Sequence, residues 1–209
     1  YIGVSEIMYG SKIVRSDGKV WMSPSLTPMV FQSKHVVSLR GGSEFNTGLS
    51  PDRSPIVFVA YSKAVSLLAS RLVRNNQVIY SFGGVGSDSS VTVYVFATGI
   101  SKKEKWGMSF FNSSGVEIYN TANIPLSFTF LDNKSWNSGD KHNFDYPVAI
   151  VPTYANAFAI PMPGGAKTLV YGYTCYGNTV SSILVNEING GATLAINNRV
   201  PVLNRNLYG

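Results

Sequence analysis

The sequence is poor in the residues from which most catalytic and metal sites are built. Its 209 residues include one cysteine, Cys175, and two histidines, His35 and His142. A single cysteine excludes an internal disulfide and is typical of a chain that folds in a reducing cytoplasm. Two histidines leave few candidates for a general base, and the motifs of serine hydrolases, zinc peptidases and phosphate-binding loops are absent. We therefore expect no catalytic residues, no metal site and no cofactor.

Charged residues are also scarce, at 13% of the chain, which is about half of the usual share. A content of 12% aromatic residues together with 20 glycines excludes a disordered, charge-rich tail and disfavours a helical bundle. The net charge of +6 comes from 17 basic against 11 acidic residues, and the basic residues are scattered along the chain. Nucleic-acid-binding proteins usually concentrate basic residues on one face, so we expect no nucleic-acid partner. No apolar run reaches the length of about 18 residues that indicates a membrane-spanning helix.

The sequence does contain alternating polar and apolar residues interrupted by turn residues, which is the pattern of antiparallel β-structure. Asp-Gly, Asn-Asn and Ser-Gly turns between such runs predict four hairpins, over residues 12–22, 72–80, 110–119 and 194–203. Pro201 places the last of these strands at a sheet edge, because proline cannot donate a backbone hydrogen bond. Longer strands are predicted at 90–98 and 168–176. Cys175, within the second of them, is expected to be a half-buried core thiol.

Residues 62–74 allow two interpretations. Val65, Leu68 and Leu72 fall at helical spacing, and Ser62 is available as a helix cap. The segment nevertheless continues directly into the Asn-Asn turn of a predicted hairpin, so we favour a strand. The glycine-rich run 83–87 lacks the lysine of a phosphate-binding loop and is expected to be a flexible loop.

A weak internal repeat relates two stretches of the chain. Residues 10–31 and 107–128 align without a gap, with five identities at a constant spacing of 97, as between Gly18 and Gly115 (115 − 18). Turn chemistry alone makes hairpins look alike, but the number of identities favours a duplication. We therefore predict an all-β fold of two tandem antiparallel β-sandwich-like domains, over residues 1–100 and 101–209. Their boundary is expected in the polar stretch 99–105.

The best candidate site is the polar segment 132–146, which groups carboxylates, amides, a histidine and aromatic rings. Aromatic rings stack on the apolar faces of sugars and amides bond their hydroxyl groups, so this composition is typical of sugar recognition. The simplest interpretation is still an exposed polar loop that connects two strands, and binding of Ca²⁺ through carboxylate and amide oxygens is a further alternative. The residues expected to bind are Trp136, Asn137, Asp140, His142, Asp145 and Tyr146.

A second long polar segment, residues 41–53, precedes a predicted strand at Pro55 much as the first segment precedes a strand at Pro147. Long loops in compact domains usually carry function. Equivalent loops on two similar halves would form a joint binding surface rather than one buried pocket. From this segment we expect Glu44, Phe45, Asn46 and Arg53 to contribute.

The stretch from Tyr9 to Phe31 (YGSKIVRSDGKVWMSPSLTPMVF), with its echo WGMSFFNSSGVEIYNT from Trp106 to Thr121, resembles a family of small virion tail proteins of long-tailed bacteriophages. The pattern shared within that family is a short hairpin with a preceding glycine and a turn that carries Asn or Asp and Gly, in β-rich surroundings. The resemblance implies a structural or adhesive role at the tail tip or tail fibre. It supplies no catalytic residues.

The resemblance leads us to expect a phage tail-tip or tail-fibre protein that takes part in host receptor binding without catalysis. It would be synthesised in the cytoplasm of the bacterial host and located in the virion. Its expected partners are other phage tail proteins and a bacterial surface receptor, either a glycan or an outer-membrane protein. Fibres commonly close as trimers, so we expect a homo-oligomer and most simply a homotrimer. A purely structural collar or adaptor is the alternative, and a glycan-cleaving enzyme that uses Asp140 and Asp145 is the least favoured hypothesis.

Overall fold

The computed structural model of the chain describes residues 13–14, 18, 20–22, 27–39, 42–63, 68–83, 89–103, 106–132, 139–190 and 199–209. These residues form strands and turns, with two short 3-10 turns and no α-helix among them, which confirms the predicted all-β class. The chain divides into two compact units, each assembled from two separate stretches of sequence. Unit 1 comprises Tyr1–Gln32 and Phe96–Leu126, and unit 2 comprises Ser33–Val95 and Ser127–Gly209.

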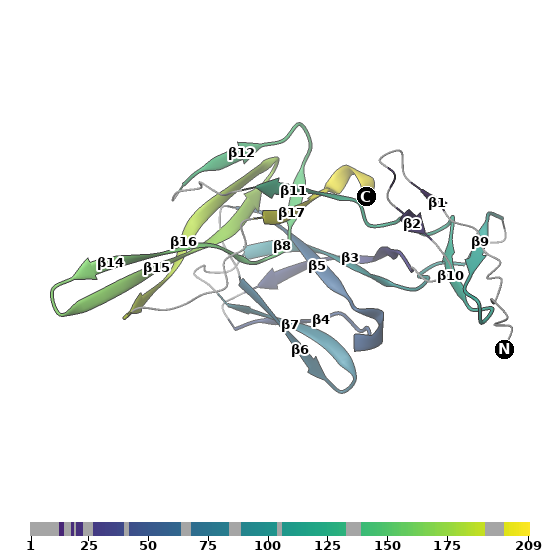
Figure 1. The fold of residues 1–209 in the computed structure, drawn as a ribbon, viewed down its shortest axis with the longest axis horizontal. Helices are drawn as coiled ribbons and strands as arrows, with labels where there is room; N and C mark the ends of the chain where they lie inside the picture. The colour runs from purple at the N-terminus through teal and green to yellow at the C-terminus, as the bar shows by residue number, and fades with distance from the viewer. Residues whose placement is uncertain are drawn as a thin grey trace, which may run out of the picture. The chain divides into compact units, whose positions relative to one another are not determined.

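The strands are labelled in Figure 1 in chain order. Unit 1 contains β1 (Ile13–Val14), β2 (Val20–Met22), β9 (Ser109–Phe111) and β10 (Glu117–Asn120). Unit 2 contains β4 (Glu44–Asn46), β5 (Ile56–Tyr61), β6 (Leu68–Arg74), β7 (Gln77–Gly83), β11 (Phe128–Asp132), β12 (Lys141–Asn143), β13 (Val148–Ile150), β14 (Tyr154–Met162), β15 (Gly165–Tyr176), β16 (Thr179–Asn189) and β17 (Arg199–Asn204). The strands β3 (Met29–Leu39) and β8 (Ser89–Thr98) contribute residues to both units. The 3-10 turns are η1 (Pro51–Arg53) and η2 (Arg205–Leu207).

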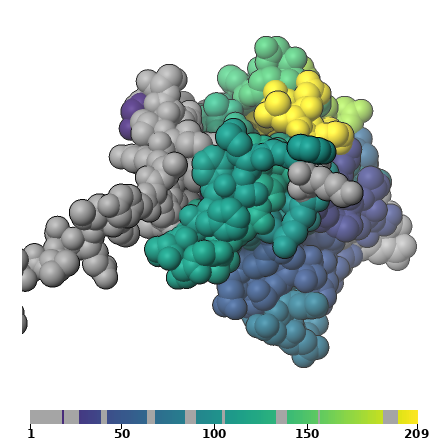
Figure 2. All heavy atoms as spheres, turned by 90° about the vertical axis from the view of Figure 1, so that its right-hand side faces the viewer, coloured from purple at the N-terminus to yellow at the C-terminus, as the bar shows by residue number. Residues whose placement is uncertain are grey.

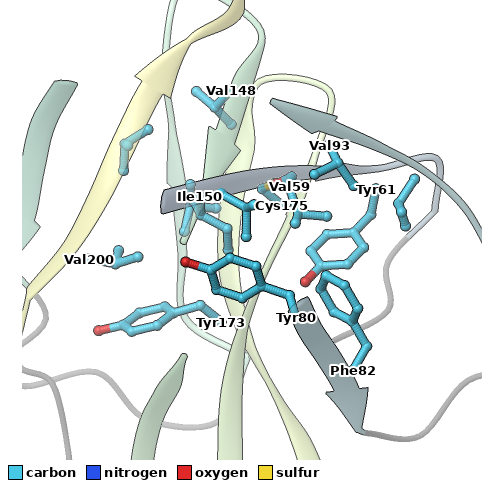
Figure 3. Packing of buried hydrophobic residues seen from close by; sticks show 14 of the residues in the cluster. Val59, Tyr61, Tyr80, Phe82, Val93, Val148, Ile150, Tyr173, Cys175 and Val200 are labelled. Carbon is cyan, nitrogen blue, oxygen red and sulfur yellow. The ribbon is translucent and has the colours of Figure 1, made fainter. Parts of the chain in front are cut away.

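Unit 2 encloses a hydrophobic core between two sheets. The larger sheet has the strand order β11-β17-β13-β5-β15-β16-β12, with β14 paired to β15 and β8 paired to β5, and the smaller sheet has the order β4-β7-β6. Side chains from the facing sides of the two sheets meet in this core, and the central strands β5 and β13 are also buried on their opposite face. In Figure 3, Tyr80 and Phe82 of the smaller sheet belong to the same cluster as Val59, Ile150 and Tyr173 of the larger one. Each fully buried side chain of this size contributes about 1.5–3 kcal/mol to folding.

Turn chemistry explains where the hairpins form. Asn75 and Asn76 connect β6 to β7, and both have positive φ, at 51° and 57°, as the central residues of a tight hairpin turn require. The predicted hairpins over residues 12–22, 72–80 and 110–119 are confirmed. The predicted strands at 90–98 and 168–176 are confirmed too, as is a strand rather than a helix for residues 68–74.

The fourth predicted hairpin differs from the structure at its second strand. Residues 194–198, its first strand and its turn, lie outside the described residues. The same holds for residues 84–87 of the glycine-rich run, for which a flexible loop was predicted. The strand β17 pairs with β11 on one side and with β13 on the other, so the prediction of an edge strand is wrong. Pro201 fits there because β13 pairs only with residues 202–204, beyond the proline.

The units of the structure do not coincide with domains of residues 1–100 and 101–209. The stretch 99–105 belongs to unit 1, and the larger sheet of unit 2 joins β5, from before that stretch, to β13 and β15, from after it. Long-range pairing of this kind depends on which strands meet in space, and a turn pattern read along the sequence does not report it.

Unit 1 carries both hairpins of the internal repeat. Their described residues pair in the same register at a spacing of 97 (110 − 13), and each hairpin contains a register shift between its pairs. Gly18 and Gly115 occupy equivalent turn positions, with φ of 80° and 74°. A duplication of whole domains stays a prediction, but the two hairpins are equivalent in register as well as in sequence. The pairs are Ile13 with Met22 and Val14 with Val20 in the first, and Phe110 with Tyr119 and Phe111 with Glu117 in the second.

Candidate functional site

The predicted binding residues of the segment 41–53 make contacts within the fold. Arg74 of β6 donates two hydrogen bonds to the carboxylate of Glu44, at 2.9 and 3.1 Å, and this hydrogen bonding and charge raise the pKa of Arg74. Asn46 donates from Nδ2 to Oε1 of Gln77 at 2.7 Å. The first contact joins β6 to β4, the two strands that flank β7, and the second joins β4 to β7 itself. Both contacts are exposed. Arg53 ends the turn η1 and is half-buried.

Phe45 corrects the expectation that this whole segment is an exposed loop. It lies in β4 between two exposed residues, and only 8% of its surface is accessible because its ring belongs to the core of unit 2. The ring also contacts His35 edge-on, with 5.3 Å between centroids. Alternation along a short strand turns Glu44 and Asn46 outward and Phe45 inward. Phe45 therefore stabilises the fold and offers little surface to a partner.

In the second predicted segment, residues 132–146, the side chains of β12 likewise point alternately to the two faces of the sheet. Trp136 and Asn137 lie outside the described residues, Asp140 is half-buried, and Asp145 is exposed. The ring of His142 on β12 contacts Phe144, with 4.7 Å between centroids, and Phe144 contacts Tyr146 at 5.3 Å. Phe144 and Tyr146 pack against the core, so the even-numbered residues from 142 to 146 form one row of rings on the core side of the larger sheet.

The odd-numbered residues of β12 face the other way and line a hollow of about 370 Å³. Lys141 lies opposite Ser181 of β16, and Asn143 lies opposite Thr179. The next strand, β15, places Thr174 beside Ser181 and Tyr176 beside Thr179. The hollow is therefore a row of hydroxyl, amide and ammonium groups across neighbouring strands, with Tyr176 at one end. Its lining residues are Lys141, Asn143, Thr174, Tyr176, Thr179 and Ser181.

A second hollow, of about 310 Å³, shares Tyr176 with the first. Its other lining residues come from β5, β8, the β15–β16 turn and the turn η2: Ala60, Tyr61, Ser62, Ser90, Thr92, Gly177 and Arg205. Tyr176 is 57% exposed, and its side chain has no hydrogen-bond or ring partner among the described residues. We call the two hollows together the Tyr176 groove.

Hydrogen bonds hold the groove in shape. The backbone N–H of Val148 donates to the carbonyl of Gly177 at 2.9 Å, and Nδ2 of Asn178 donates to the carbonyl of Phe144 at 2.8 Å, so the β15–β16 turn is tied to the segment after β12. Arg205 is fixed at the other side of the groove. Its backbone N–H donates to the carbonyl of Pro147 at 2.9 Å and its Nε donates to the hydroxyl of Tyr94 at 3.0 Å. The C-terminal residues, yellow in Figure 2, lie at the surface.

The chemistry of the groove suits binding better than catalysis. Its described lining contains two cations, Lys141 and Arg205, together with hydroxyl groups, one amide and two tyrosine rings, of which that of Tyr61 is buried, and it contains no carboxylate. Hydrolysis by a pair of carboxylates needs two acids that flank the ligand, and the described lining supplies neither. A polar surface with one exposed ring is instead suited to a ligand that has both hydroxyl groups and an apolar face.

Cys175, next to Tyr176 in the sequence, is a fully buried core residue rather than a half-buried one. Its Sγ donates to the carbonyl of Val59 at 3.2 Å, and burial raises the pKa of the thiol to about 12. A thiol in this state carries almost no thiolate at neutral pH, so it is no nucleophile.

Within the described ranges, no group of three or more His, Cys, Asp or Glu side chains is arranged to hold a metal ion. No helix in that part of the chain has the length and apolar character needed to cross a membrane.

Sequence reasoning found the strand that carries the groove but missed the residues that line it. Lys141 and Asn143 lie within the predicted segment, and neither was selected, because the segment was treated as an irregular loop. The signal that identifies them is the alternation of β12, which turns His142 and Asn143 to opposite faces. Arg205 had no such signal, because its place depends on how the turn after β17 packs against Tyr94.

In comparison with known proteins, no family model matches the sequence, and neither a curated protein nor a solved structure is significantly similar to it.

Proposed function

We propose that the chain is a non-catalytic carbohydrate-binding protein of a bacteriophage tail tip or tail fibre, which binds a host-surface glycan in the Tyr176 groove. The observation that carries this proposal is the exposed ring of Tyr176 between two hollows lined by hydroxyl and amide groups. Sugars present an apolar face to an aromatic ring and hydroxyl groups to polar side chains. The pairing of one ring with such a lining fits them better than it fits a purely apolar ligand.

The shape of the site supports attachment to a polymer. The two hollows share Tyr176 as a lining residue, so a ligand that is several sugar units long suits the groove better than a single sugar does. Contacts of this kind are individually weak. Display of several copies on one virion multiplies them, because each further binding event is intramolecular and gains from a high effective concentration.

The assignment to a phage virion rests on the resemblance of residues 9–31 and 106–121 to small tail proteins. The described parts of these two stretches are hairpins of the same register, which is consistent with one repeated structural element. In this proposal unit 1 takes part in the contacts with other tail proteins and unit 2 binds the receptor.

The test is binding of labelled protein to bacterial cells and to purified bacterial surface polysaccharides, by the wild type and by Tyr176→Ala. Phe130→Ala is the matched control, because Phe130 is also an exposed aromatic residue of the larger sheet but lies on β11, outside the groove. We expect saturable binding that falls at least tenfold in Tyr176→Ala and is unchanged in Phe130→Ala. Absence of binding across the panel, or equal binding by both variants, would overturn the proposal.

A purely structural tail component is the second candidate, and an exposed apolar row on β14 favours it. Phe158, Ile160 and Met162 alternate along this strand and are exposed, and Leu184 of β16 is exposed too. No charged residue occurs in β14, so two copies of the strand could approach without repulsion. We expect this row to contact a second copy of the chain in a homo-oligomer, most simply a homotrimer. Sedimentation of wild type and Ile160→Lys tests it: a monomeric wild type would exclude this role.

A further inference from the structure

The charged groups of the Tyr176 groove indicate which class of carbohydrate it binds. This inference rests on the proposed function. We infer that the groove binds an acidic polysaccharide, one whose carboxylate or phosphate groups recur along a chain of sugars. The two charged residues of the described lining, Lys141 and Arg205, are both cations. They line different hollows, and Tyr176 lines both.

These two cations differ from the other basic residues of unit 2 that lie near acids. Arg74, Lys167 and Arg199 each form an ion pair, with Glu44, Glu187 and Asp132 respectively. Neither Lys141 nor Arg205 forms an ion pair with a described acid. Asp140 and Asp145 are near Lys141 in the sequence, but neither of them lines the groove. Within the described part of the chain, no acid pairs with these two cations, so their charge is available to a ligand.

The side chain of Arg205 is preorganised for binding such a ligand. Its Nε bond to the Tyr94 hydroxyl fixes the plane of the guanidinium group, and η2 is capped by Asn204, whose side chain accepts from the backbone N–H of Asn206 at 3.0 Å. A guanidinium held in one orientation loses less conformational entropy when it binds a carboxylate or phosphate, and it can donate two parallel hydrogen bonds.

Lys141 supplies the second charge in a different way. It stands on β12 opposite Ser181, in the row that also contains Thr174. An ammonium group on a flexible stem binds anions as a point charge, with little demand on geometry. One fixed and one adaptable cation, in different hollows that share an aromatic residue, match a polymer with charges on separate sugar units better than a single small anion.

Binding is measured by biolayer interferometry with immobilised hyaluronate, polygalacturonate, glycerol-phosphate teichoic acid and neutral dextran, and with carboxyl-reduced polygalacturonate. We expect at least one acidic polymer to bind at least tenfold more tightly than dextran, and binding to a carboxylate polymer to fall at least tenfold after its reduction. Free phosphate and free galacturonate, as competitors, are expected to displace the polymer only weakly. Affinity for the acidic polymer should also fall as salt increases, because ionic contacts are screened.

The variants are Lys141→Gln, Arg205→Gln and the charge-preserving Lys141→Arg, with Arg71→Gln as matched control. Arg71 is an exposed cation of the smaller sheet, so its loss changes the net charge equally but leaves the groove intact. We expect at least tenfold weaker binding in the two groove variants to glutamine and near-wild-type binding in Lys141→Arg and Arg71→Gln. A thermal melt of Arg205→Gln checks its fold; if that variant unfolds, Lys141→Gln decides alone.

The outcomes separate this inference from the function on which it rests. Equal binding of acidic and neutral polymers, lost in Tyr176→Ala but unchanged in Lys141→Gln, would overturn the inference and leave carbohydrate binding in place. Binding of duplex DNA as tight as that of every acidic polymer, with no effect of Tyr176→Ala, would also overturn it, because the attraction would then be one of charge alone. Absence of binding to any polymer would refute both.

Discussion

The hydroxyl of Thr179 on β16 donates a hydrogen bond of 2.7 Å to Oδ1 of Asn143 on β12. The two residues are opposite each other in the register of these strands, and both line the Tyr176 groove. The bond occupies the amide oxygen of Asn143 and leaves its Nδ2 group to donate to a ligand. A short, exposed edge strand is thus held in the orientation that the groove needs.

Loss of this bond should weaken ligand binding more than it weakens the fold. Thr179→Val keeps the branched shape of the side chain and removes the donor. We expect the free energy of unfolding to fall by about 0.5–1.5 kcal/mol, the usual contribution of one hydrogen bond, and polysaccharide affinity to fall several-fold as Asn143 rotates freely. Urea denaturation and biolayer interferometry measure the two effects. Thr179→Ser keeps the hydroxyl and should bind as the wild type does; a Thr179→Val variant with full affinity would contradict the assigned role.

The strands of this protein could be predicted because local chemistry decides them. The Asn75-Asn76 turn adopts positive φ in the structure as its residue types suggest, and β15 continues to Tyr176 as predicted, although residues 170–175 are all buried. Side chains of a strand point alternately to its two faces, so Thr174 and Tyr176 lie on the face opposite to Cys175, which was expected in the core. That face could be derived from the sequence alone, but the burial of Thr174 and the exposure of Tyr176 could not.

The remaining groove residues depend on contacts between distant parts of the chain. Arg205 reaches the groove because η2 packs beside Pro147 and Tyr94, and no spacing in the sequence encodes that arrangement. The joining of β5 to β13 and β15 in one sheet has the same origin. Turn signals specify neighbours along the chain, whereas sheet order is set by how whole strands bury their apolar faces.

Alkaline pH should destabilise the fold. Burial raises the pKa of the Cys175 thiol to about 12, and it also raises the pKa of Tyr80, Tyr173 and Tyr208. Because the folded state holds these protons more tightly than the unfolded chain, their contribution to stability is complete below the unfolded pKa values, about 8.5 for cysteine and about 10 for tyrosine, and is lost as the pH rises above them. We expect the urea midpoint to fall from about pH 8.5 upward, most steeply above pH 10.

Cys175→Ala measures how much of the loss of stability at alkaline pH is caused by the thiol. The variant should be somewhat less stable at pH 7, because a buried group is removed, but its urea midpoint should fall less between pH 8.5 and pH 10. In the wild type, a thiol reagent should react with Cys175 only after denaturant is added. A wild-type midpoint that stays constant from pH 7 to pH 10.5, or rapid reaction of the native thiol, would disprove the assignment.

Gly107 should tolerate a side chain less well than Gly115. Both have positive φ, at 142° and 74°, but a Cβ at Gly107 would collide with Oγ1 of Thr121, whereas the space beside Gly115 is open. Thr121 cannot easily move, because its Oγ1 accepts a hydrogen bond from the backbone N–H of Met108 at 3.1 Å. Gly115→Ala should cost about 1–2 kcal/mol for its backbone conformation alone, and Gly107→Ala should cost more. Equal urea midpoints for the two variants would contradict this account.

Removal of the Asn123 side chain should be the most damaging polar substitution in unit 1. Its buried Oδ1 accepts from the backbone N–H of Ser101 at 2.7 Å and from that of Lys102 at 3.0 Å, and its Nδ2 donates to the Lys102 carbonyl at 3.0 Å. Asn123→Ala leaves the two backbone N–H groups without their acceptor at the site of a buried side chain, whereas the Lys102 carbonyl keeps a second donor, Nδ2 of Asn120, at 3.0 Å. Each such group costs about 1–3 kcal/mol, so we expect a loss on the order of 3 kcal/mol and faster amide exchange at Ser101 and Lys102.

The matched control is Asn112→Ala in the β9–β10 turn. The Oδ1 of Asn112 also accepts from two backbone N–H groups, those of Ser114 at 3.0 Å and Val116 at 2.9 Å, but this turn is exposed. Water can replace the lost acceptor there, so we expect a cost below about 1 kcal/mol. The difference between the two variants in urea denaturation therefore measures the effect of burial together with that of the additional hydrogen bonds of Asn123. If Asn112→Ala proved as damaging as Asn123→Ala, the hydrogen bonds themselves, and not their removal from water, would determine the stability of unit 1.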